Sequence, residues 1–530
     1  MPTSTGFDRE TSQFYLVGGG IAAMSAAALL IREGQVSGSN IHILEQSDRL
    51  GGSLDGSGSP ETGYLIRGGR MFEEHFGCTF DLFDSIPTLT DSQKSVSAEI
   101  KEFSRQYVTS SKSRLVRTGQ KIEAPQFGLN FRNKWELGRL LLANEESLGT
   151  TTIQEYFSLD FLQTNFWIMW STMFAFQPWH AVAEMRRYMH RFIHLFPGLN
   201  RLEGILRTKY NQYDSLILPL FEWLQNQGVN FRMQTEVTDI EFELQDSQFK
   251  ARSLRVRVHG KETELALRAQ DFLFVTLGSM TENSSLGSMQ TPPKLQTESI
   301  GSWQLWKNIA SQSPDFGNPQ AFCSRIDQTK WESFTVTLRN HDFFRFMEEF
   351  TGNRAGTGGL VTFKDSSWRL SVVLAHQPHF LNQPEDVDVF WGYGLFGDRI
   401  GDSVKKKMSE CSGEELLAEL AHHLRLGDRA TRFFAGANCI PCMMPFITSQ
   451  FMPRQAGDRP EVVPKQAKNF AFLGQFTEIP KDCVFTVEYS IRSAQRAVYK
   501  LLDLKQQETP IYRGDRNPAV LWRALWTLIK

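Results

Sequence analysis

The sequence predicts a mixed α/β protein built around a Rossmann-like dinucleotide-binding domain, and three observations predict it. The first is "FYLVGGGIAAMSAAALLIREG", an apolar strand followed by glycines and an alanine-rich helix. The second is "NIHILEQSDRLGGSLDG", a strand that ends in an acid. The third is a pair of later stretches, "DFLFVTLGS" and "NFAFLGQF", each a short apolar strand ending at a glycine. Short apolar strands in this setting are typical of a parallel sheet.

The phosphate-binding fingerprint G-x-G-x-x-A falls on Gly18, Gly20 and Ala23, directly after the first strand. Glycine lets the backbone approach a pyrophosphate, and free N–H groups at the start of the next helix stabilise its charge. Glu45, at the end of the second strand, can accept hydrogen bonds from ribose hydroxyls. In this strand–turn–helix–strand setting the fingerprint predicts a dinucleotide site, and a tight turn in an unrelated α/β protein is the weaker alternative.

A second glycine turn at Gly51 and Gly52 follows Arg49 and is more typical of flavin adenine dinucleotide (FAD) proteins than of simple dehydrogenases. In two-domain flavoproteins the last strand and helix return to cover the cofactor. The strand at 470–473 and the helix at 487–502 fit that pattern. We therefore expect FAD, held by a domain that is discontinuous in sequence and comprises residues 12–90, 229–290 and 465–505.

The other segments predict a substrate domain and helical regions around the cofactor domain. Residues 91–228 carry aromatic residues at helical spacing and are expected to line a substrate channel, whereas residues 291–464 form a mixed substrate-binding domain. Residues 506–530 end in a short amphipathic helix that either docks on the protein's own surface or contacts a membrane surface. The residues of this helix that suit a lipid interface are Trp522, Arg523, Trp526 and Lys530.

Composition narrows the partners and the compartment. The 530 residues carry a net charge of −2, so no basic field points to nucleic acid. No signal peptide and no run of about 18 apolar residues occurs, so a cytoplasmic protein is expected, with at most peripheral membrane contact. Six irregularly spaced cysteines favour a reducing compartment. Cys439 and Cys442 lack a second pair of ligands, so we expect no metal.

The segment "RGGRMFEEHFGCTFDLF", residues 67–83, is dense in polar groups between phenylalanines and is predicted to form a site. Two glycines lie between two arginines, and two carboxylates, a histidine and a cysteine follow. Met71 is the unexpected member, because it places an inert thioether where a catalytic loop would need an acid or a base.

Together with four other strings, this segment resembles the oleate hydratases, also called myosin-cross-reactive antigens. The strings are "WSTMFAFQPWHAVAEMRRYMHRFIH", "KYNQYDSLILPL", "PCMMPFITSQFMPR" and "CVFTVEYSIRSAQRAV", and the resemblance runs from residue 12 to residue 525. It implies an FAD-dependent enzyme, a homodimer or monomer associated with membrane surfaces. The implied reaction adds water to the cis double bond of an unsaturated fatty acid such as oleate and gives a hydroxy fatty acid without net redox change.

The resemblance also implies roles for individual residues. Tyr188 is the implied proton donor, although without the resemblance it would be interpreted as a core tyrosine with a satisfied hydroxyl. Gln212 is the implied contact to the substrate, and Thr448 and Gln450 are the implied donors to the fatty-acid carboxylate. The implied FAD contacts are Gly18, Gly20, Glu45, Arg49, Gly52, Gly68, Gly69, Phe485, Thr486 and Glu488.

The family pattern breaks at Met71, where many members carry a glutamate that activates water. A thioether cannot accept a proton at neutral pH, so this role does not carry over. In a first interpretation, Glu73 or Glu74 takes over after a small loop shift. In a second, flavin and backbone orient the water, and Tyr188 protonates the alkene before weakly activated water is captured. In a third, the enzyme isomerises the double bond instead of hydrating it.

We expect hydration first, because it is the family's main activity, and double-bond isomerisation second. A conventional FAD oxidoreductase is the alternative from another class, and it would consume oxygen or another electron acceptor. A non-catalytic lipid-binding protein is the remaining hypothesis.

Overall fold

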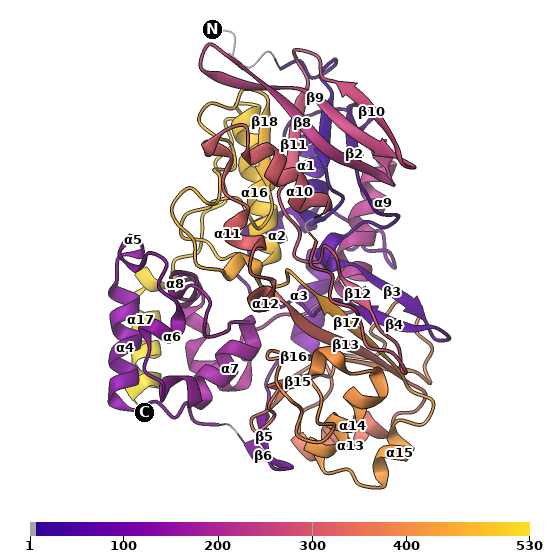
Figure 1. Ribbon diagram of the computed structural model, residues 1–530, viewed down its shortest axis with the longest axis vertical. Coiled ribbons are helices and arrows are strands. Elements are labelled where there is room, and N and C mark those ends of the chain that lie inside the picture. The colour runs from indigo at the N-terminus through magenta and orange to yellow at the C-terminus, as the bar shows by residue number, and fades with distance from the viewer. Residues whose placement is uncertain (1–6, 124, 299, 530) are drawn as a thin grey trace.

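The computed structural model describes residues 7–123, 125–298 and 300–529. A parallel sheet with its helices lies at one end, a large mixed sheet at the other, and a helical lobe at the side (Figure 1). The strands are β1 (Phe14–Val17), β2 (Ile41–Leu44), β3 (Gly56–Ser59), β4 (Gly63–Ile66), β5 (Ser113–Arg117), β6 (Gln120–Glu123), β7 (Asn230–Arg232), β8 (Thr235–Gln245), β9 (Gln248–Val258), β10 (Lys261–Ala266), β11 (Phe272–Thr276), β12 (Ser285–Leu286), β13 (Trp331–Leu338), β14 (Leu360–Phe363), β15 (Leu370–Val373), β16 (Asp388–Gly394), β17 (Asn438–Met444) and β18 (Phe470–Leu473). The α-helices are α1 (Ile21–Arg32), α2 (Gly77–Asp84), α3 (Val96–Gln106), α4 (Phe131–Leu142), α5 (Glu145–Leu148), α6 (Ile153–Tyr156), α7 (Asn165–Phe174), α8 (Val182–Arg191), α9 (Leu218–Asn226), α10 (Gly301–Ala310), α11 (Gln320–Cys323), α12 (Ile326–Thr329), α13 (Asp342–Thr351), α14 (Gly413–Leu424), α15 (Arg429–Phe433), α16 (Val487–Leu501) and α17 (Pro518–Ile529).

Strands from distant parts of the chain form one parallel sheet in the order β18-β11-β1-β2-β7. Phe14 pairs with Ile41 on one side and with Phe272 on the other, although Phe272 follows it by 258 positions (272 − 14). Parallel strands are covered on both faces, which is why these strands are almost continuously apolar. The predicted fold class, with its discontinuous Rossmann-like domain, is confirmed.

Helices α1 and α16 pack against each other beside this sheet (Figure 1). Helix α1 is rich in small side chains, and Ala23, Ala26 and Ala27 are fully buried. Small residues let two helices approach closely. The N-termini of both helices are thereby held near the ends of the central strands.

A second, mixed sheet has the order β12-β17-β13-β16-β15-β14-β5-β6 and carries α13, α14 and α15 with a hydrophobic core of their own. The β3–β4 hairpin packs onto β13. The N–H groups of Tyr64 and Ile66 donate to the hydroxyls of Thr337 and Thr335 at 2.8 and 3.1 Å. The segment that starts at Arg67 therefore leaves the hairpin at the junction between the two sheets.

The helical lobe explains the aromatic density of the sequence. Most side chains of α7, "NFWIMWSTMF", are buried, so its tryptophans and phenylalanines are core. The predicted C-terminal helix is present as α17, which packs on the 3-10 helix Ile193–Arg201, and Lys530 lies outside the described residues. Within the described part of the chain, no helix has the length and hydropathy needed to span a bilayer.

Candidate active site

A cleft of about 500 Å³ opens at the carboxyl ends of β1, β2, β11 and β18. Open α/β sheets bind their ligands at this edge, and the volume suits a cofactor. The predicted cofactor residues that line the cleft are Gly18, Gly20, Glu45, Arg49 and Gly52.

The glycine turn after β1 forms a cradle for phosphate. Gly18 has a φ of +98°, and a Cβ at Gly20 would meet no atom within 4 Å, because this position borders the cleft. Gly20 is the N-cap of α1 and supplies no side-chain cap, so the first N–H groups of the helix stay available to an anion. Ala23 lies deeper in α1, fully buried, where a small residue supports close packing.

Glu45 is fixed at the edge of the cleft. Its Oε2 accepts a hydrogen bond from the N–H of Gly19 at 2.6 Å, and its Oε1 accepts one from the N–H of Ser47 at 2.8 Å. Arg49 donates to the Gly56 carbonyl at 2.7 Å. An anion cradle with a carboxylate held beside it in one cleft fits a dinucleotide.

A smaller pocket of about 70 Å³ lies between residues 69–73, α8 and the start of α16. Many of its lining side chains are aromatic or aliphatic, as an apolar substrate requires. Predicted site residues from three separate segments meet in it, namely Gly69, Met71, Glu73, Tyr188, Phe485 and Thr486.

Tyr188 is only 2% exposed. Four phenylalanines surround its ring with centroids 5.0–5.8 Å away, namely Phe174, Phe176, Phe192 and Phe451. The hydroxyl donates to the Val484 carbonyl at 2.6 Å. Burial raises the pKa of the phenol well above its usual range, so Tyr188 keeps its proton at neutral pH.

Glu73 is buried and held by three cationic or polar neighbours. Arg191 lies 2.7 Å from its Oε1, and ring nitrogens of His75 and His194 lie 2.9 and 3.2 Å from its Oε2. Burial alone would raise the pKa of Glu73, but the two histidines and the charge of Arg191 outweigh burial and hold the pKa far below its usual range. A carboxylate with so low a pKa is a weak base.

Met71 and Glu74 differ sharply in position. Met71 lines the pocket and packs against the main hydrophobic core, so its thioether is part of an apolar wall. The Glu74 side chain is 76% exposed and does not line the pocket. Gly68 also lies outside it, where a Cβ would come within 3.1 Å of the Arg70 guanidinium.

Arg70 is a pocket residue that the sequence reasoning did not single out. Its guanidinium lies 4.9 Å from the centre of the Phe485 ring, and burial lowers its pKa to about 10. Its main-chain N–H donates to Gln212 Oε1 at 3.3 Å, so Gln212 supports the loop from outside the pocket. The sequence feature that could have indicated Arg70 is the second arginine of "RGGR", because its side chain stays charged and lies next to an aromatic segment.

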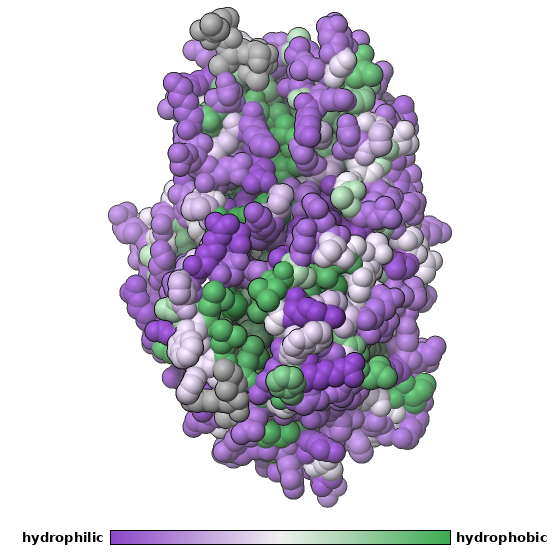
Figure 2. Space-filling model, turned by 90° about the vertical axis from the view of Figure 1, so that its left-hand side faces the viewer, coloured by the Kyte–Doolittle hydropathy of each residue, from purple (hydrophilic) through white to green (hydrophobic). Residues whose placement is uncertain are grey.

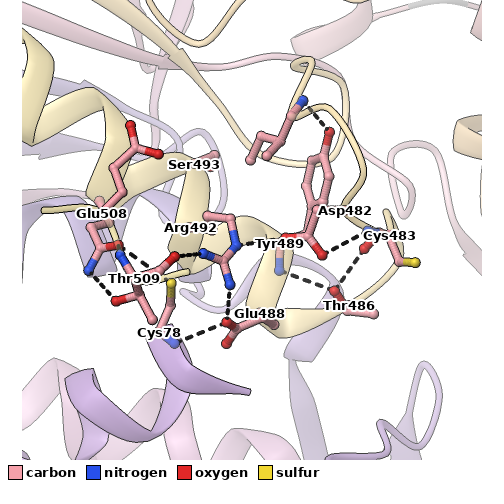
Figure 3. Close-up of polar contacts among 12 residues, drawn as sticks. Cys78, Asp482, Cys483, Thr486, Glu488, Tyr489, Arg492, Ser493, Glu508 and Thr509 are labelled. Atoms are coloured by element: carbon pink, nitrogen blue, oxygen red, sulfur yellow. Dashed lines mark hydrogen bonds and ion pairs between the residues drawn. The ribbon is translucent and has the colours of Figure 1, made fainter. Parts of the chain in front are cut away.

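A buried network holds the start of α16 beside the pocket (Figure 3). Arg492 donates to Asp482 Oδ2 and to Glu488 Oε1, each at 2.7 Å. Glu488 also accepts from the N–H groups of Cys78 and Thr79 at the start of α2, at 3.0 and 2.8 Å. Glu488 therefore joins α16 to α2 instead of lining the pocket.

The network leaves Phe485 and Thr486 at the pocket. Phe485 adopts a φ of +67°, a conformation that costs energy for a residue with a side chain and is found mainly at functional sites. The Thr486 hydroxyl caps α16 by accepting from the N–H of Tyr489 at 3.1 Å.

Thr448 and Gln450 lie behind the aromatic wall. Both are fully buried, and the Thr448 hydroxyl donates to the Thr329 carbonyl at 2.9 Å. Gln450 Nε2 donates to the Ile447 carbonyl, whereas its Oε1 is buried without a hydrogen-bond partner. The next residue, Phe451, reaches both the Tyr188 and the Phe485 rings, at 5.8 and 5.5 Å.

Comparison with known proteins settles the family. A sequence model of the MCRA family matches residues 11–499. The chain belongs to the MCRA family. It is 40% identical to an oleate hydratase of Streptococcus pyogenes serotype M49 (strain NZ131) over 94% of this chain and 86% of that protein. It is 31% identical to a linoleate hydratase of Lactiplantibacillus plantarum over 97% of this chain and 98% of that protein. The resemblance inferred from the sequence is thus confirmed.

Solved structures similar to this MCRA chain share its fold at low sequence identity. Cyclohexylamine oxidase from Brevibacterium oxydans IH-35A has a TM-score of 0.54 at 13% identity, covering 93% of this chain and 99% of that one. A variant of putrescine oxidase has a TM-score of 0.52 at 13% identity, covering 93% and 98%. At this identity the likeness concerns the fold.

Proposed function

We propose that this protein is an FAD-dependent hydratase that adds water to the cis double bond of an unsaturated fatty acid such as oleate. The observation that carries the proposal is the pocket in which Tyr188, a buried and protonated phenol, lies within an aromatic wall. The two hydratase relatives support the substrate class. Double-bond isomerisation by the same phenol is the second candidate, and Met71 is the residue that favours it.

FAD would occupy the large cleft. Gly18 and Gly20 with the start of α1 would hold the pyrophosphate, and Glu45 would accept from the ribose. Phe485 and Thr486 would close the flavin end. Hydration has no net redox change, so the flavin would not transfer electrons. It would supply polar ring atoms and help to hold the neighbouring groups in place.

The chain's own residues account for the proton. Tyr188 would turn its hydroxyl from the Val484 carbonyl toward the alkene and donate its proton to one alkene carbon. Burial makes a phenol a weak acid, but the charge of Arg70 in the same pocket acts in the opposite direction by favouring the phenolate that forms. The phenylalanine wall excludes bulk water, so the cationic carbon would react with the single water molecule that enters the pocket with the substrate.

Water addition would proceed with weak activation. Met71 cannot accept a proton, Glu74 is exposed, and Glu73 is held by Arg191 and two histidines. We infer that Glu73 holds the loop in place and that water adds to a carbon already made electrophilic by protonation. The proton that the added water loses would return to the Tyr188 phenolate, which regenerates the donor. Thr448 and Gln450 would meet the fatty-acid carboxylate beyond Phe451, once their present hydrogen bonds open toward the ligand.

We also propose that α17 contacts a lipid surface, which would let a fatty acid reach the pocket without crossing water. Ala524 faces the protein, whereas Trp522 and Trp526 are 66% and 50% exposed. Figure 2 looks onto the side that carries α17 and α4 and shows hydrophobic residues gathered on its lower half. Exposed apolar residues in a group mark interaction surfaces.

The decisive variant for the proposed function is Tyr188→Phe, which keeps the ring and removes the donor. Loss of a general acid costs about 10²–10⁴-fold in rate, so turnover of oleic acid should fall by that factor with bound flavin unchanged. Tyr393→Phe is the matched control, because Tyr393 is equally buried and also donates to a carbonyl but lies outside the pocket. Full activity of Tyr188→Phe at every pH would overturn the assignment.

A further inference from the structure

A cluster of three side chains, two of them on α14 in the lower lobe of Figure 1, lies outside the site described above. Glu419 and His423 are four residues apart on α14 and therefore project from the same face of the helix. Asp402 comes from the loop that follows β16. One ligand atom from each residue lies within 4.8 Å of the others.

The distances within the cluster suit a metal ion. His423 Nε2 lies 3.4 Å from Asp402 Oδ2 and 3.5 Å from Glu419 Oε1. Ligands bound tetrahedrally to zinc at about 2.0–2.1 Å are separated by roughly 3.3 Å from one another. Two of the three separations are thus close to the edge of a zinc coordination tetrahedron, and the third, between the two carboxylates, lies within 4.8 Å.

The burial and hydrogen bonding of the cluster point to a missing partner. The His423 side chain is 5% exposed, and its Nε2 is buried without a hydrogen-bond partner although it faces both carboxylates. Such a buried polar atom costs free energy unless something satisfies it. A bound cation would use the lone pair of a neutral imidazole at this position.

The charges lead to the same conclusion. Glu419 has no exposed side-chain surface, yet among the described residues neither Glu419 nor Asp402 forms an ion pair with a lysine or an arginine. The buried Glu73, Glu184 and Glu488 each have an arginine partner. Buried charges are paired or coordinate metals, and two carboxylates with a neutral histidine match the charge of a divalent ion.

The carboxylates are already held in place by backbone donors. Glu419 Oε2 accepts from the N–H groups of Ser403 and Val404, both at 2.9 Å, and Oε1 accepts from that of Asp402 at 2.5 Å. Asp402 Oδ2 accepts from the N–H of Ser367 at 2.8 Å. The Oδ2 and Oε1 atoms that face His423 therefore each keep a lone pair, and the backbone hydrogen bonds fix the orientation of both atoms toward an ion.

We propose that Asp402, Glu419 and His423 bind one Zn²⁺ ion that fastens the loop after β16 to α14. A histidine with two carboxylates favours zinc over calcium or magnesium, which take oxygen ligands. Ser403 and His423 border a cavity of about 480 Å³, which gives the ion an access path and leaves room for a water ligand.

The proposal departs from the expectation of no metal, which rested on cysteine spacing. All six cysteines are buried, and burial is the main reason why the pKa of the Cys442 thiol rises to about 11. The proposed site uses no cysteine. It lies apart from the Tyr188 pocket, so the ion's role is to stabilise the fold.

Zinc binding by the flavin-loaded protein tests the proposal. After treatment with a chelator, the wild type should take up one Zn²⁺ per chain, and its melting temperature should rise with zinc concentration but not with calcium. Asp402→Asn and His423→Ala should lose both effects. Zinc should still bind to Cys442→Ser and to His341→Ala, which removes a histidine–aspartate pair elsewhere in the same lobe.

Bound flavin and the melting temperature without metal show whether each variant is folded. If His423→Ala alone fails to fold, zinc binding by Asp402→Asn tests the proposal. The proposal is overturned if the wild type takes up no zinc, if a folded Asp402→Asn or His423→Ala variant binds it as well as the wild type, or if Cys442→Ser abolishes binding.

Discussion

Met71 is the residue at which the sequence is expected to depart from the family pattern. It lines the pocket beside Tyr188, so its replacement by a carboxylate would put a base within the aromatic wall. Met71→Glu should keep or raise hydration and raise the ratio of hydroxy acid to shifted alkene. Burial would raise the pKa of the new carboxyl, and a base acts only when deprotonated. The gain should therefore appear at pH values above that pKa, in product ratios measured across pH.

Met71→Leu is the control, because it keeps an apolar side chain of similar size and should leave the product ratio unchanged. If Met71→Glu abolished hydration at every pH while Met71→Leu did not, the interpretation of Met71 as a dispensable wall residue would be wrong.

Individual roles were only partly predictable from the sequence. Tyr188 and Phe485 lie 297 positions apart (485 − 188), and only the resemblance suggested that they share a site. Glu73 looked like a substitute base, but two of its three partners are distant in sequence, since Arg191 comes from α8 and His194 from the 3-10 helix that follows. Arg70 was overlooked because nothing local indicates that an arginine lies over a distant phenylalanine.

At the scale of elements, the turn from β1 into α1 should decide cofactor affinity. Gly20 borders the cleft, so Gly20→Val would put a branched side chain where the pyrophosphate approaches the backbone. We expect clearly weaker FAD binding in a titration of the flavin-free protein. Gly138→Val is the control, because a Cβ there also meets no atom within 4 Å but lies on α4, outside the cleft. Equal affinity of both variants would contradict the cofactor placement.

The attachment of α8 to the segment after β17 should show in acid stability. Glu184 lies 2.9 Å from Arg459, and although burial acts against its charge, the neighbouring arginines hold its pKa at about 2, below its ordinary 4.5. A carboxyl with a depressed folded-state pKa stabilises the fold fully above its ordinary value and loses that contribution as pH falls toward the folded value. Urea midpoints should therefore drop between pH 5 and pH 2.

Glu184→Gln should lower stability at pH 7 by about 3–5 kcal/mol, because it leaves buried arginines with a weaker partner. The same variant should show a smaller drop between pH 5 and pH 2 than the wild type. An equal drop in both proteins would mean that other carboxyls control the acid transition.

Elements were easier to predict than sites. The strands at 14–17 and 470–473 and the helix from 487 are marked by local apolar runs and glycines, and they lie where the sequence indicated. The pairing of β5 with β14 was not predictable, because it joins residues about 250 positions apart, as Leu115 and Thr362 show (362 − 115 = 247). Periodicity gives no register for contacts of that separation.

At the scale of the whole molecule, α17 should bind the protein to the lipid surface from which the fatty acid is taken up. Removal of residues 517–530 should weaken binding to liposomes, and so should the double change Trp522→Ser with Trp526→Ser. Leu244→Ser is the control, because Leu244 is equally exposed but lies on β8. Unchanged sedimentation with vesicles would favour a helix that only docks on the protein.

Hydration adds an oxygen atom from water, isomerisation adds none, and oxidation consumes an electron acceptor. The source of the oxygen in the product is therefore the most direct test of the account. The FAD-loaded protein, with its flavin reduced, should be incubated with oleic acid in heavy-oxygen water and the products analysed by mass spectrometry. We expect a hydroxy fatty acid that carries one heavy oxygen atom, formed without consumption of oxygen. A shifted alkene without label, or a product whose formation requires an electron acceptor, would contradict the hydratase proposal.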